Sequence, residues 1–257
     1  MKHAFEFIDH RDTSDKNASV GKTMMLDKGL GLKAVDDLLV TAGEYIDFVK
    51  LGWGTAATMS DELIMVKNQK YADHGIIPYP GGTLLEVAVL QGKYKEYLLE
   101  AQRLGFKGIE VSDGSTQINV EKREQLIKEA REAGFFVISE VGKKDQNLDH
   151  QLSVAERVAL INEDLANGAH FVIIEARKAG KNIGIYDEDG NIITDELDAL
   201  AANGTEQLIF EAPLKKQQVN LILRYGKDVN LGNIAFDEIT SLATLRQGLR
   251  GDTVNKV

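Results

Sequence analysis

Short β-like runs in this sequence repeatedly end in a charged or amide side chain. A charge at a strand tip is costly to bury unless it is paired, bound to a metal or open to water. In parallel α/β barrels the carboxyl ends of the strands meet at one face, where the catalytic side chains lie. We therefore expect these side chains to gather in one site. The residues concerned are Asp27, Lys28, Lys50, Glu110, Glu140, Glu175, Glu211 and Asn230.

Helical patterns alternate with the strand-like runs along the chain, which implies a parallel sheet with right-handed crossovers. The predicted strands are 23–26, 45–51, 76–79, 108–111, 135–141, 171–175, 207–211 and 228–232. The predicted helices are 30–42, 60–74, 84–90, 94–104, 119–133, 153–167, 195–202, 215–225 and 236–248. A small β excursion is expected within the glycine-rich stretch 178–191.

A barrel and an open doubly wound sheet both satisfy this alternation. Eight strand–helix units favour the barrel, and no glycine-rich dinucleotide fingerprint follows the first strand. The length of 257 residues is close to the ~250 residues typical of one such barrel. Because no Pro/Ser-rich linker divides the chain, we predict that residues 1–257 form a single (β/α)8 TIM barrel domain.

Composition limits the possible functions. The chain contains no cysteine, which excludes disulfides, thiol catalysis and cysteine-ligated metals. Its formal net charge of −10 disfavours nucleic acid or an anionic membrane as a partner. The first residues are too polar for a signal peptide, and no stretch approaches the ~20 apolar residues of a membrane helix. We expect a cytoplasmic protein.

The strand-end acids suit a hard cation such as Mg²⁺, which prefers oxygen ligands. The alternative is that they pair with barrel lysines and serve packing only, and spacing does not show which acids would touch a metal. Lys50, inside the tight run 48–52, is expected to be functional, whereas Lys144 is expected to be a solvated surface lysine. Backbone N–H groups in small-residue turns could hold phosphate or simply shape turns. These turns are 52–55, 81–83 and 231–233.

Nine segments, in order and covering nearly the whole chain, resemble the phosphosulfolactate synthase family. They are MMLDKG (24–29), DFVKLGWGT (47–55), PYPGGTLLEVA (78–88), GIEVSDG (108–114), VISEVGKK (137–144), IIEAR (173–177), IFEAP (209–213), VNLGNI (229–234) and LRGDT (249–253). The resemblance implies a (β/α)8 fold and a magnesium-dependent lyase that adds sulfite to phosphoenolpyruvate. The product would be (2R)-3-phosphosulfolactate, which in archaea begins coenzyme M biosynthesis.

The resemblance also implies roles for individual residues. Glu110, Glu140 and Glu175 become candidate ligands of Mg²⁺. Lys143 becomes the candidate proton donor, by analogy with lysines of enolase-type enzymes. The remaining candidates for catalysis are Lys50, Lys28 and Asp27, and those for binding the substrate are Arg177, Ser112, Glu211, Asn230 and Gly232.

One segment departs from the family pattern. Members tend to carry a basic Lys-Pro-Arg-like stretch shortly before the first strand, where this chain reads Lys16-Asn17-Ala18-Ser19-Val20-Gly21 without arginine. Lys16 or Lys22 could replace the arginine, although lysine lacks its bidentate fork. The alternatives are therefore a family relative with lost or altered activity, acting in binding or stress, and another enolate-forming lyase or aldolase.

The apolar segment near the start of the chain has two possible places. Phe5, Phe7 and Ile8 could cap the bottom of the barrel or join a subunit interface. A homo-oligomer is therefore one of our expectations.

Overall fold

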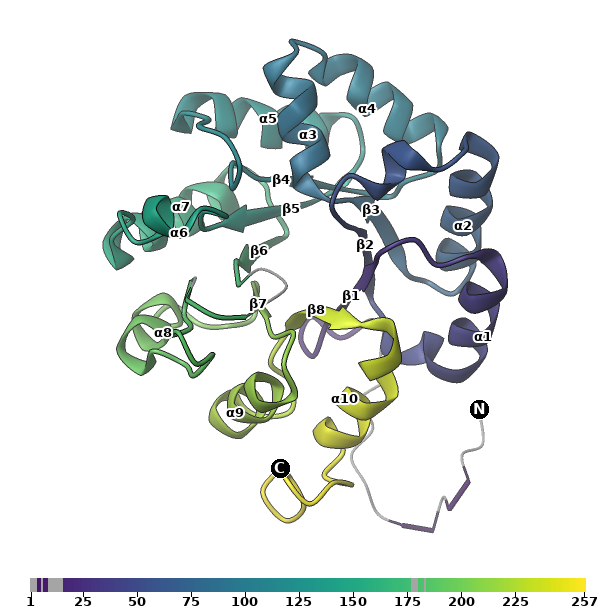
Figure 1. The fold of residues 1–257 in the computed structure, drawn as a ribbon, viewed down its shortest axis with the longest axis vertical. Helices are drawn as coiled ribbons and strands as arrows, with labels where there is room; N and C mark the ends of the chain where they lie inside the picture. The colour runs from purple at the N-terminus through teal and green to yellow at the C-terminus, as the bar shows by residue number, and fades with distance from the viewer. Residues whose placement is uncertain (1–3, 6, 9–15, 177–179, 183) are drawn as a thin grey trace.

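Eight parallel strands form a nearly closed barrel in the described part of the chain (Figure 1). The structure is a computed structural model that describes residues 4–5, 7–8, 16–176, 180–182 and 184–257. The hydrogen-bonded strand order is β3-β2-β1-β8-β7-β6-β5-β4. The strands are β1 Thr23–Asp27, β2 Phe48–Leu51, β3 Ile77–Pro80, β4 Gly108–Val111, β5 Phe136–Val141, β6 Phe171–Ile174, β7 Leu208–Glu211 and β8 Leu231–Ala235. The predicted TIM barrel is confirmed.

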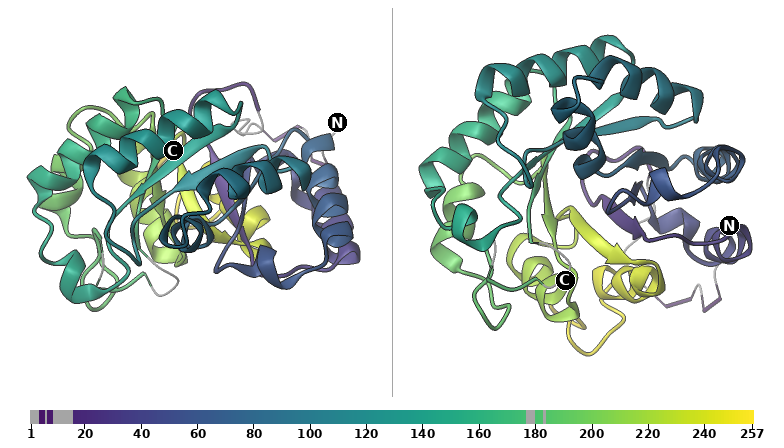
Figure 2. Two further views of the ribbon diagram at one scale, coloured as in Figure 1. Left: turned by 90° about the horizontal axis from the view of Figure 1, so that it is seen from above. Right: turned by 45° about the horizontal axis from the view of Figure 1, so that its top comes forward.

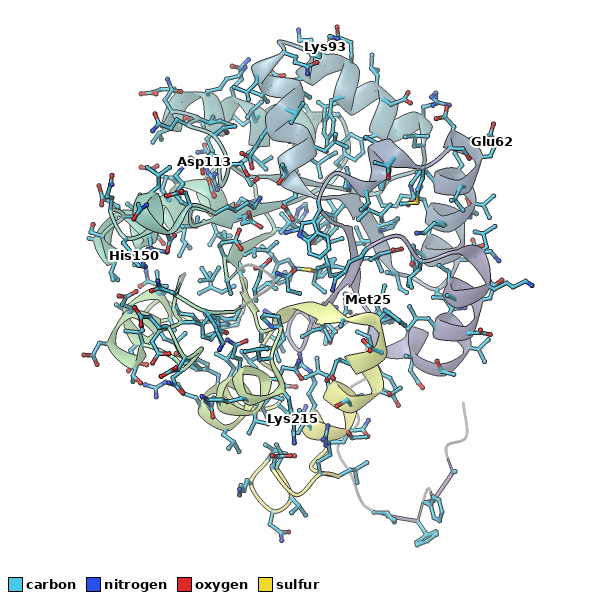
Figure 3. The ribbon with its side chains drawn as sticks, viewed as in Figure 1. Met25, Glu62, Lys93, Asp113, His150 and Lys215 are labelled. Carbon is cyan, nitrogen blue, oxygen red and sulfur yellow. The ribbon has the colours of Figure 1, made fainter. Side chains whose placement is uncertain are left out.

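Helices surround the strands (Figure 2), and the exposed side chain of Glu62 on α2 points away from the barrel (Figure 3). The α-helices are α1 Leu32–Ala42, α2 Asp61–Asp73, α3 Gly82–Leu90, α4 Tyr94–Arg103, α5 Val120–Glu132, α6 Gln146–Asp149, α7 Val154–Ala166, α8 Thr194–Leu200, α9 Lys215–Tyr225 and α10 Ile239–Arg246. Short 3₁₀ helices are Gly43–Tyr45, Thr55–Thr58 and Phe236–Glu238.

Local capping chemistry fixes several helix starts where the sequence predicts them. The Ser60 side chain accepts a hydrogen bond from the Leu63 N–H (3.3 Å) at the start of α2. Ser153 and Glu156 form a complete capping box at the start of α7. Such caps satisfy backbone N–H groups that have no partner inside the helix.

Alternation along the strands builds two layers inside the barrel. Side chains two positions apart point to the same face of a strand. The lower layer is apolar and includes Phe48, Ile138, Ile173 and Ile209. Two residues further along the same strands, and therefore nearer their carboxyl ends, come Lys50, Glu140, Glu175 and Glu211.

The barrel has an incomplete seam between β3 and β4. The N–H groups of Ile77 and Gly81 donate to the β2 side, to Asp47 O (2.9 Å) and Leu51 O (3.0 Å). The intervening Pro78 and Pro80 therefore face β4, and proline has no N–H to donate. A backbone bond from Lys107 N–H to the Pro78 carbonyl (3.0 Å) joins the two strands at the start of the seam. The hydrogen-bonded ladder consequently ends at β3 on one side and at β4 on the other.

The last strand lies three residues later in the sequence than we predicted. We expected 228–232, but β8 runs from Leu231 to Ala235, so Asn230 precedes the strand instead of ending it. The buried Asn230 amide binds backbone groups at the amino end of the barrel. Its Oδ1 accepts from Lys22 N–H (2.9 Å), and its Nδ2 donates to the carbonyls of Thr205 (3.3 Å), Glu206 (3.0 Å) and Leu208 (3.0 Å). These contacts join β1, β7 and β8 at the end of the barrel opposite the strand tips.

Other boundaries differ less. The predicted strand 45–51 begins instead with the 3₁₀ helix Gly43–Tyr45, and the predicted helix 236–248 begins with the 3₁₀ helix Phe236–Glu238. The expected β excursion reduces to an antiparallel bridge between Tyr186 and Ile192 within the described residues. No helix among the described residues is long and apolar enough to cross a membrane.

We predict that Asn230→Ala lowers the free energy of unfolding by about 3 kcal/mol, because buried backbone groups lose their partners. Urea unfolding monitored by circular dichroism measures the change. Asn233→Gly is the matched control, since glycine tolerates the positive φ of 54° at that position. A control variant as unstable as Asn230→Ala would contradict this assignment.

Candidate active site

Lys50 lies at the centre of a buried group of carboxylates at the carboxyl ends of the strands. Its Nζ is 2.9 Å from Glu110 Oε2, 2.9 Å from Glu140 Oε2 and 3.6 Å from Glu211 Oε1. These side chains come from β2, β4, β5 and β7, so the fold brings together distant parts of the chain. The predicted convergence of Lys50, Glu110, Glu140 and Glu211 is observed.

Lys144 supplies a second cation to the same group. Its Nζ donates to Thr83 Oγ1 (2.9 Å) and lies 3.5 Å from Glu140 Oε1 and 3.8 Å from Glu86 Oε1. Three-quarters of its side chain is buried, because 25% remains exposed. The expectation of a solvated surface lysine was wrong. Lys144 follows Glu140 by four residues, in the loop after β5.

The carboxyl groups outnumber the ammonium groups, and their pKa values diverge as a result. Burial, reinforced by Glu140 and Glu211, raises the pKa of Glu175 well above its usual value. Burial also raises the pKa of Glu110, to about 7, against the opposing effect of Lys50. For Glu140 burial acts in the same direction, but Lys144 and Lys50 outweigh it and lower the pKa. Burial thus favours the protonated form of Glu175, whereas the two lysines favour the ionised form of Glu140.

The two lysines remain charged in this environment. Burial alone would lower their pKa values. The carboxylates around Lys50, led by Glu110 and Glu140, instead raise its pKa well above the usual value. Glu140 and Glu175 raise the pKa of Lys144 in the same way. The site thus holds two ammonium groups beside several buried carboxyl groups whose pKa values differ.

A cavity of about 250 Å³ opens above this group. Asn233 lines it from β8, held at a φ of 54°, and within the described residues its Oδ1 has no hydrogen-bond partner. An unsatisfied buried acceptor facing a cavity suits a ligand that donates a hydrogen bond. The cavity is lined by Leu26, Lys50, Trp53, Gly81, Gly82, Thr83, Glu110, Lys144, Glu175, Glu211 and Asn233.

The glycine turn before α3 packs tightly against the site. The Gly82 N–H donates to Glu110 Oε1 (2.7 Å). A Cβ at Gly82 would lie 2.2 Å from Ser112 Oγ and 2.8 Å from Glu110 Oε1, so a larger residue does not fit without rearrangement. Of the three turns considered as anion sites, 81–83 borders the cavity throughout, 52–55 contributes Trp53 and 231–233 contributes Asn233.

Several predicted residues lie outside the centre of the site. Asp27 pairs with Lys67 Nζ (2.7 Å) and accepts a hydrogen bond from the Tyr71 hydroxyl (2.9 Å). Both partners belong to α2, so Asp27 anchors that helix to β1. Lys28 is exposed, and its Nζ lies 5.3 Å from the centre of the Trp53 ring.

Lys143 and Ser112 also have protein partners. Lys143 Nζ forms an ion pair with the Asp113 carboxylate and donates to the Asp113 carbonyl (2.9 Å). Ser112 Oγ donates to Glu86 Oε1 (2.6 Å).

Two further substrate-binding candidates are not brought to the cavity, and a third is not described. A Cβ at Gly232 would meet Met24 Cε at 2.6 Å and Ile209 Cγ2 at 2.9 Å, so this glycine faces the packed interior. Asn230 lies at the opposite end of the barrel. Arg177 lies outside the described residues.

The sequence analysis considered Thr83 and Asn233 only as parts of the turns 81–83 and 231–233, and it missed Glu86. The Glu86 carboxylate is fully buried and accepts from Ser115 N–H (2.8 Å) and Thr116 Oγ1 (3.0 Å) as well as from Ser112. It therefore holds the loop after β4 against α3. The side chain of Asn233, in the middle of β8, would have been recognised with the correct register of that strand, whereas nothing in the sequence marks Glu86.

The acids fit magnesium in chemistry but are not arranged as a ready metal site. Their oxygen donors and surplus negative charge suit a hard cation. Among the described residues, however, no three His, Cys, Asp or Glu side chains form a group that could hold a metal ion. The Lys50 ammonium lies between Glu110 and Glu140, which explains why these carboxylates do not converge on a common empty point.

We predict that Glu175→Gln makes stability less dependent on pH. A carboxyl group whose folded pKa is raised stabilises the fold below its unfolded pKa of about 4.5, and this contribution is lost as pH rises through the folded pKa. The variant should therefore gain stability relative to the unmodified chain as the pH rises from 4.5 to 8. Urea unfolding at several pH values measures this difference. Glu132→Gln, at an exposed position on α5, is the control, and parallel pH profiles for both variants would contradict the prediction.

Comparisons with solved structures identify the barrel in other proteins. The structure resembles the YdjI aldolase from Escherichia coli K12 with a TM-score of 0.58 and 11% identity, covering 88% of this chain and 79% of that one. It resembles 3-hexulose-6-phosphate synthase from Salmonella typhimurium with a TM-score of 0.55 and 15% identity, covering 88% and 100%. At such identities the likeness concerns the fold alone.

Sequence comparisons are more specific. The family model described as (2R)-phospho-3-sulfolactate synthase (ComA) matches residues 11–252. The chain is 52% identical to the phosphosulfolactate synthase of Methanocaldococcus jannaschii, and the match covers 99% of both chains. It is 47% identical to that of Methanothermobacter thermautotrophicus, again covering 99% of both, and 36% identical to that of Bacillus subtilis, covering 93% and 94%. The chain belongs to the phosphosulfolactate synthase family.

Proposed function

We propose that this chain adds sulfite to phosphoenolpyruvate and forms (2R)-3-phosphosulfolactate. The observation that carries the proposal is the buried pair of ammonium groups, Lys50 and Lys144, beside the cavity at the mouth of the barrel. Membership of the family supports an enzyme of this class. The reactants are both anions, so the two ammonium groups are the groups of this site that can attract them, and a bound cation would offset the surplus of carboxylates.

The reaction needs charge stabilisation and one proton. The sulfur of sulfite attacks the methylene carbon of phosphoenolpyruvate, and the C–S bond forms as the double bond opens. The electron pair moves onto the phosphate-bearing carbon and its carboxylate, and a proton then completes that carbon. No group leaves. Catalysis therefore depends on stabilising the growing negative charge on the carboxylate and on placing a proton donor nearby.

Lys144 suits the role of proton donor better than Lys143. The ammonium group of Lys144 borders the cavity and stays protonated beside Glu140. Lys143 is instead held by the side chain and carbonyl of Asp113. We therefore assign the proton transfer to Lys144 and a structural role to Lys143. Lys50, surrounded by three carboxylates, would hold the charged layer together and orient the anions.

Magnesium completes the proposal. Glu110, Glu140 and Glu175 are the residues that would hold it. When bound, the ion would neutralise the substrate carboxylate as its charge grows, which is help given in the transition state. Because metal ligands must be deprotonated, the raised pKa of Glu175 would make metal binding stronger as the pH rises.

The residues that depart from the family pattern before β1 do not line the cavity. Lys16, Ala18 and Ser19 line a cleft at the amino end of the barrel, opposite the cavity. Lys22 lies there too, and its Nζ pairs with Asp47 (3.0 Å). The alternative of an inactive family relative is motivated only by this segment. Binding of phosphoenolpyruvate without turnover would favour it.

We predict that Lys144→Met lowers kcat for phosphosulfolactate formation by about 10²–10⁴-fold, the usual contribution of a general acid. Lys143→Met is the matched control and should lower kcat by less than tenfold. Mass spectrometry of the product, after incubation with phosphoenolpyruvate, sulfite and Mg²⁺, provides the rates. Absence of product with the unmodified chain would refute the function, whereas the reverse order of the two variants would refute only the choice of lysine.

We also predict that chelation removes activity and that Mg²⁺ restores it. Glu140→Gln should raise the Mg²⁺ concentration needed for half-maximal rate by at least about tenfold, because one anionic ligand is lost. Calorimetric titration of the protein with Mg²⁺ tests binding separately from rate. Unchanged Mg²⁺ binding in Glu140→Gln would contradict its role as a ligand.

A further inference from the structure

The rim of the candidate active site, where its cavity meets water, carries the one tryptophan of the sequence, Trp53. Trp53 lines the cavity, yet it is 54% exposed. It lies in the turn after β2, and the Lys28 ammonium, in the turn after β1, is 5.3 Å from the centre of its ring. The two strands pair with Asp27 opposite Leu51, so both turns leave the barrel side by side. Neither side chain has a role in the proposed proton transfer.

Trp53 has a backbone conformation that bulky residues rarely adopt, with a φ of 56°. Backbone contacts hold this turn. The Gly52 N–H donates to the Asp27 carbonyl (3.3 Å), and the Thr55 N–H donates to the Gly52 carbonyl (3.1 Å). These contacts do not involve the Trp53 ring, so the turn should persist without it. Backbone strain of this kind clusters at ligand-binding sites.

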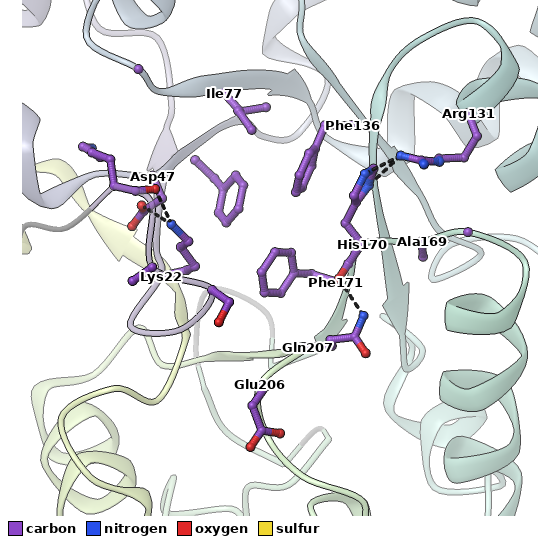
Figure 4. A pocket seen from close by; sticks show the side chains of 16 residues that line it. Lys22, Asp47, Ile77, Arg131, Phe136, Ala169, His170, Phe171, Glu206 and Gln207 are labelled. Carbon is purple, nitrogen blue, oxygen red and sulfur yellow. Dashed lines mark hydrogen bonds and ion pairs between the residues drawn. The ribbon is translucent and has the colours of Figure 1, made fainter.

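Lys28 has a positive charge available for a ligand. Within the part of the chain that the structure describes, its ammonium has no carboxylate partner, whereas Lys50 and Lys144 both lie beside glutamates. At the opposite end of the barrel Lys22 is likewise held by Asp47 (3.0 Å; Figure 4). The flexible four-carbon stem of Lys28, which is exposed, lets its ammonium reach past the neighbouring ring toward the cavity.

We propose that Lys28 and Trp53 bind an oxyanion group of one of the two reactants at the rim. The Lys28 ammonium contacts the oxygens of the anion, and the Trp53 ring holds the ammonium by a cation–π contact. The ring also covers the bound anion, and exclusion of water strengthens the charge interaction. The group is either the phosphate of phosphoenolpyruvate or sulfite itself. This identity of the anion rests on the proposed function.

The emission of Trp53 reports on the rim alone, because the sequence has no other tryptophan. We expect phosphoenolpyruvate and sulfite, titrated separately in the presence of Mg²⁺, to reveal which of them changes this emission saturably. Inorganic phosphate is the third probe, since it tests the oxyanion site without the reaction.

Lys28→Met should raise the dissociation constant of the anion bound at the rim by at least about tenfold, because a charge-assisted hydrogen bond is lost. The reactant whose affinity falls is the one that binds there. Lys33→Met is the matched control, since Lys33 is an exposed lysine on α1 that does not line the cavity. It should leave all three dissociation constants unchanged.

Trp53→Gly separates a binding role from a structural one. Glycine adopts a positive φ without strain, so the urea midpoint of unfolding should stay the same or rise. The dissociation constant of the rim anion, measured by calorimetry, should nevertheless increase about 2–30-fold, as expected when a cation–π contact is lost. Trp53→Phe keeps an aromatic face and should restore most of the affinity.

Three results would overturn the proposal. They are an emission that none of the three anions changes, equal affinities in Lys28→Met and Lys33→Met, and a Trp53→Gly variant less stable than the unmodified chain. Failure of the enzymatic function gives a different result. A chain that binds phosphate through Lys28 but forms no phosphosulfolactate would refute the reaction and retain the rim site.

Discussion

The ion pairs of Lys50 make the charged interior of this barrel possible. Four glutamates reach the same buried layer from different strands, and burying so many carboxylates without compensation would cost several kcal/mol for each ion. The Lys50 ammonium contacts Glu110, Glu140 and Glu211, and the Lys144 ammonium adds a second positive charge beside Glu140. Strand register places these groups in one layer directly above the apolar one. The site and the fold therefore depend on the same residue.

Much of this arrangement could be predicted from the sequence, because it depends on chain order and on the period of two within strands. The alternation of elements predicted the barrel, and Glu110, Glu140 and Glu211 were recognised at strand ends. We predicted β8 three residues too early in the sequence, and we therefore chose Asn230 instead of Asn233 as the site residue of this strand. A shift of this kind changes both the face and the end of the barrel to which a side chain belongs.

Other features depend on contacts that no local pattern records. Asp27 looks like its counterparts at the other strand ends, yet it pairs with Lys67, forty positions away on α2. Lys143 and Lys144 are adjacent and chemically identical, and only the turn of the backbone after β5 directs one to Asp113 and the other to the cavity. Pro78 and Pro80 are the exception, because their missing N–H groups in a strand pattern indicate an edge.

Because the hydrogen-bonded ladder is incomplete between β3 and β4, the barrel can open most easily between these two strands. At its upper end the Gly82 N–H reaches across to the Glu110 carboxylate (2.7 Å), so a residue of the charged layer also fastens the wall. A ligand that binds the Glu110 carboxylate in place of the Gly82 N–H would remove this contact between β4 and the start of α3. Amide hydrogen exchange in β3 and β4 should then become faster when such a ligand occupies the cavity. The local stability of these two strands would therefore depend on what is bound in the active site.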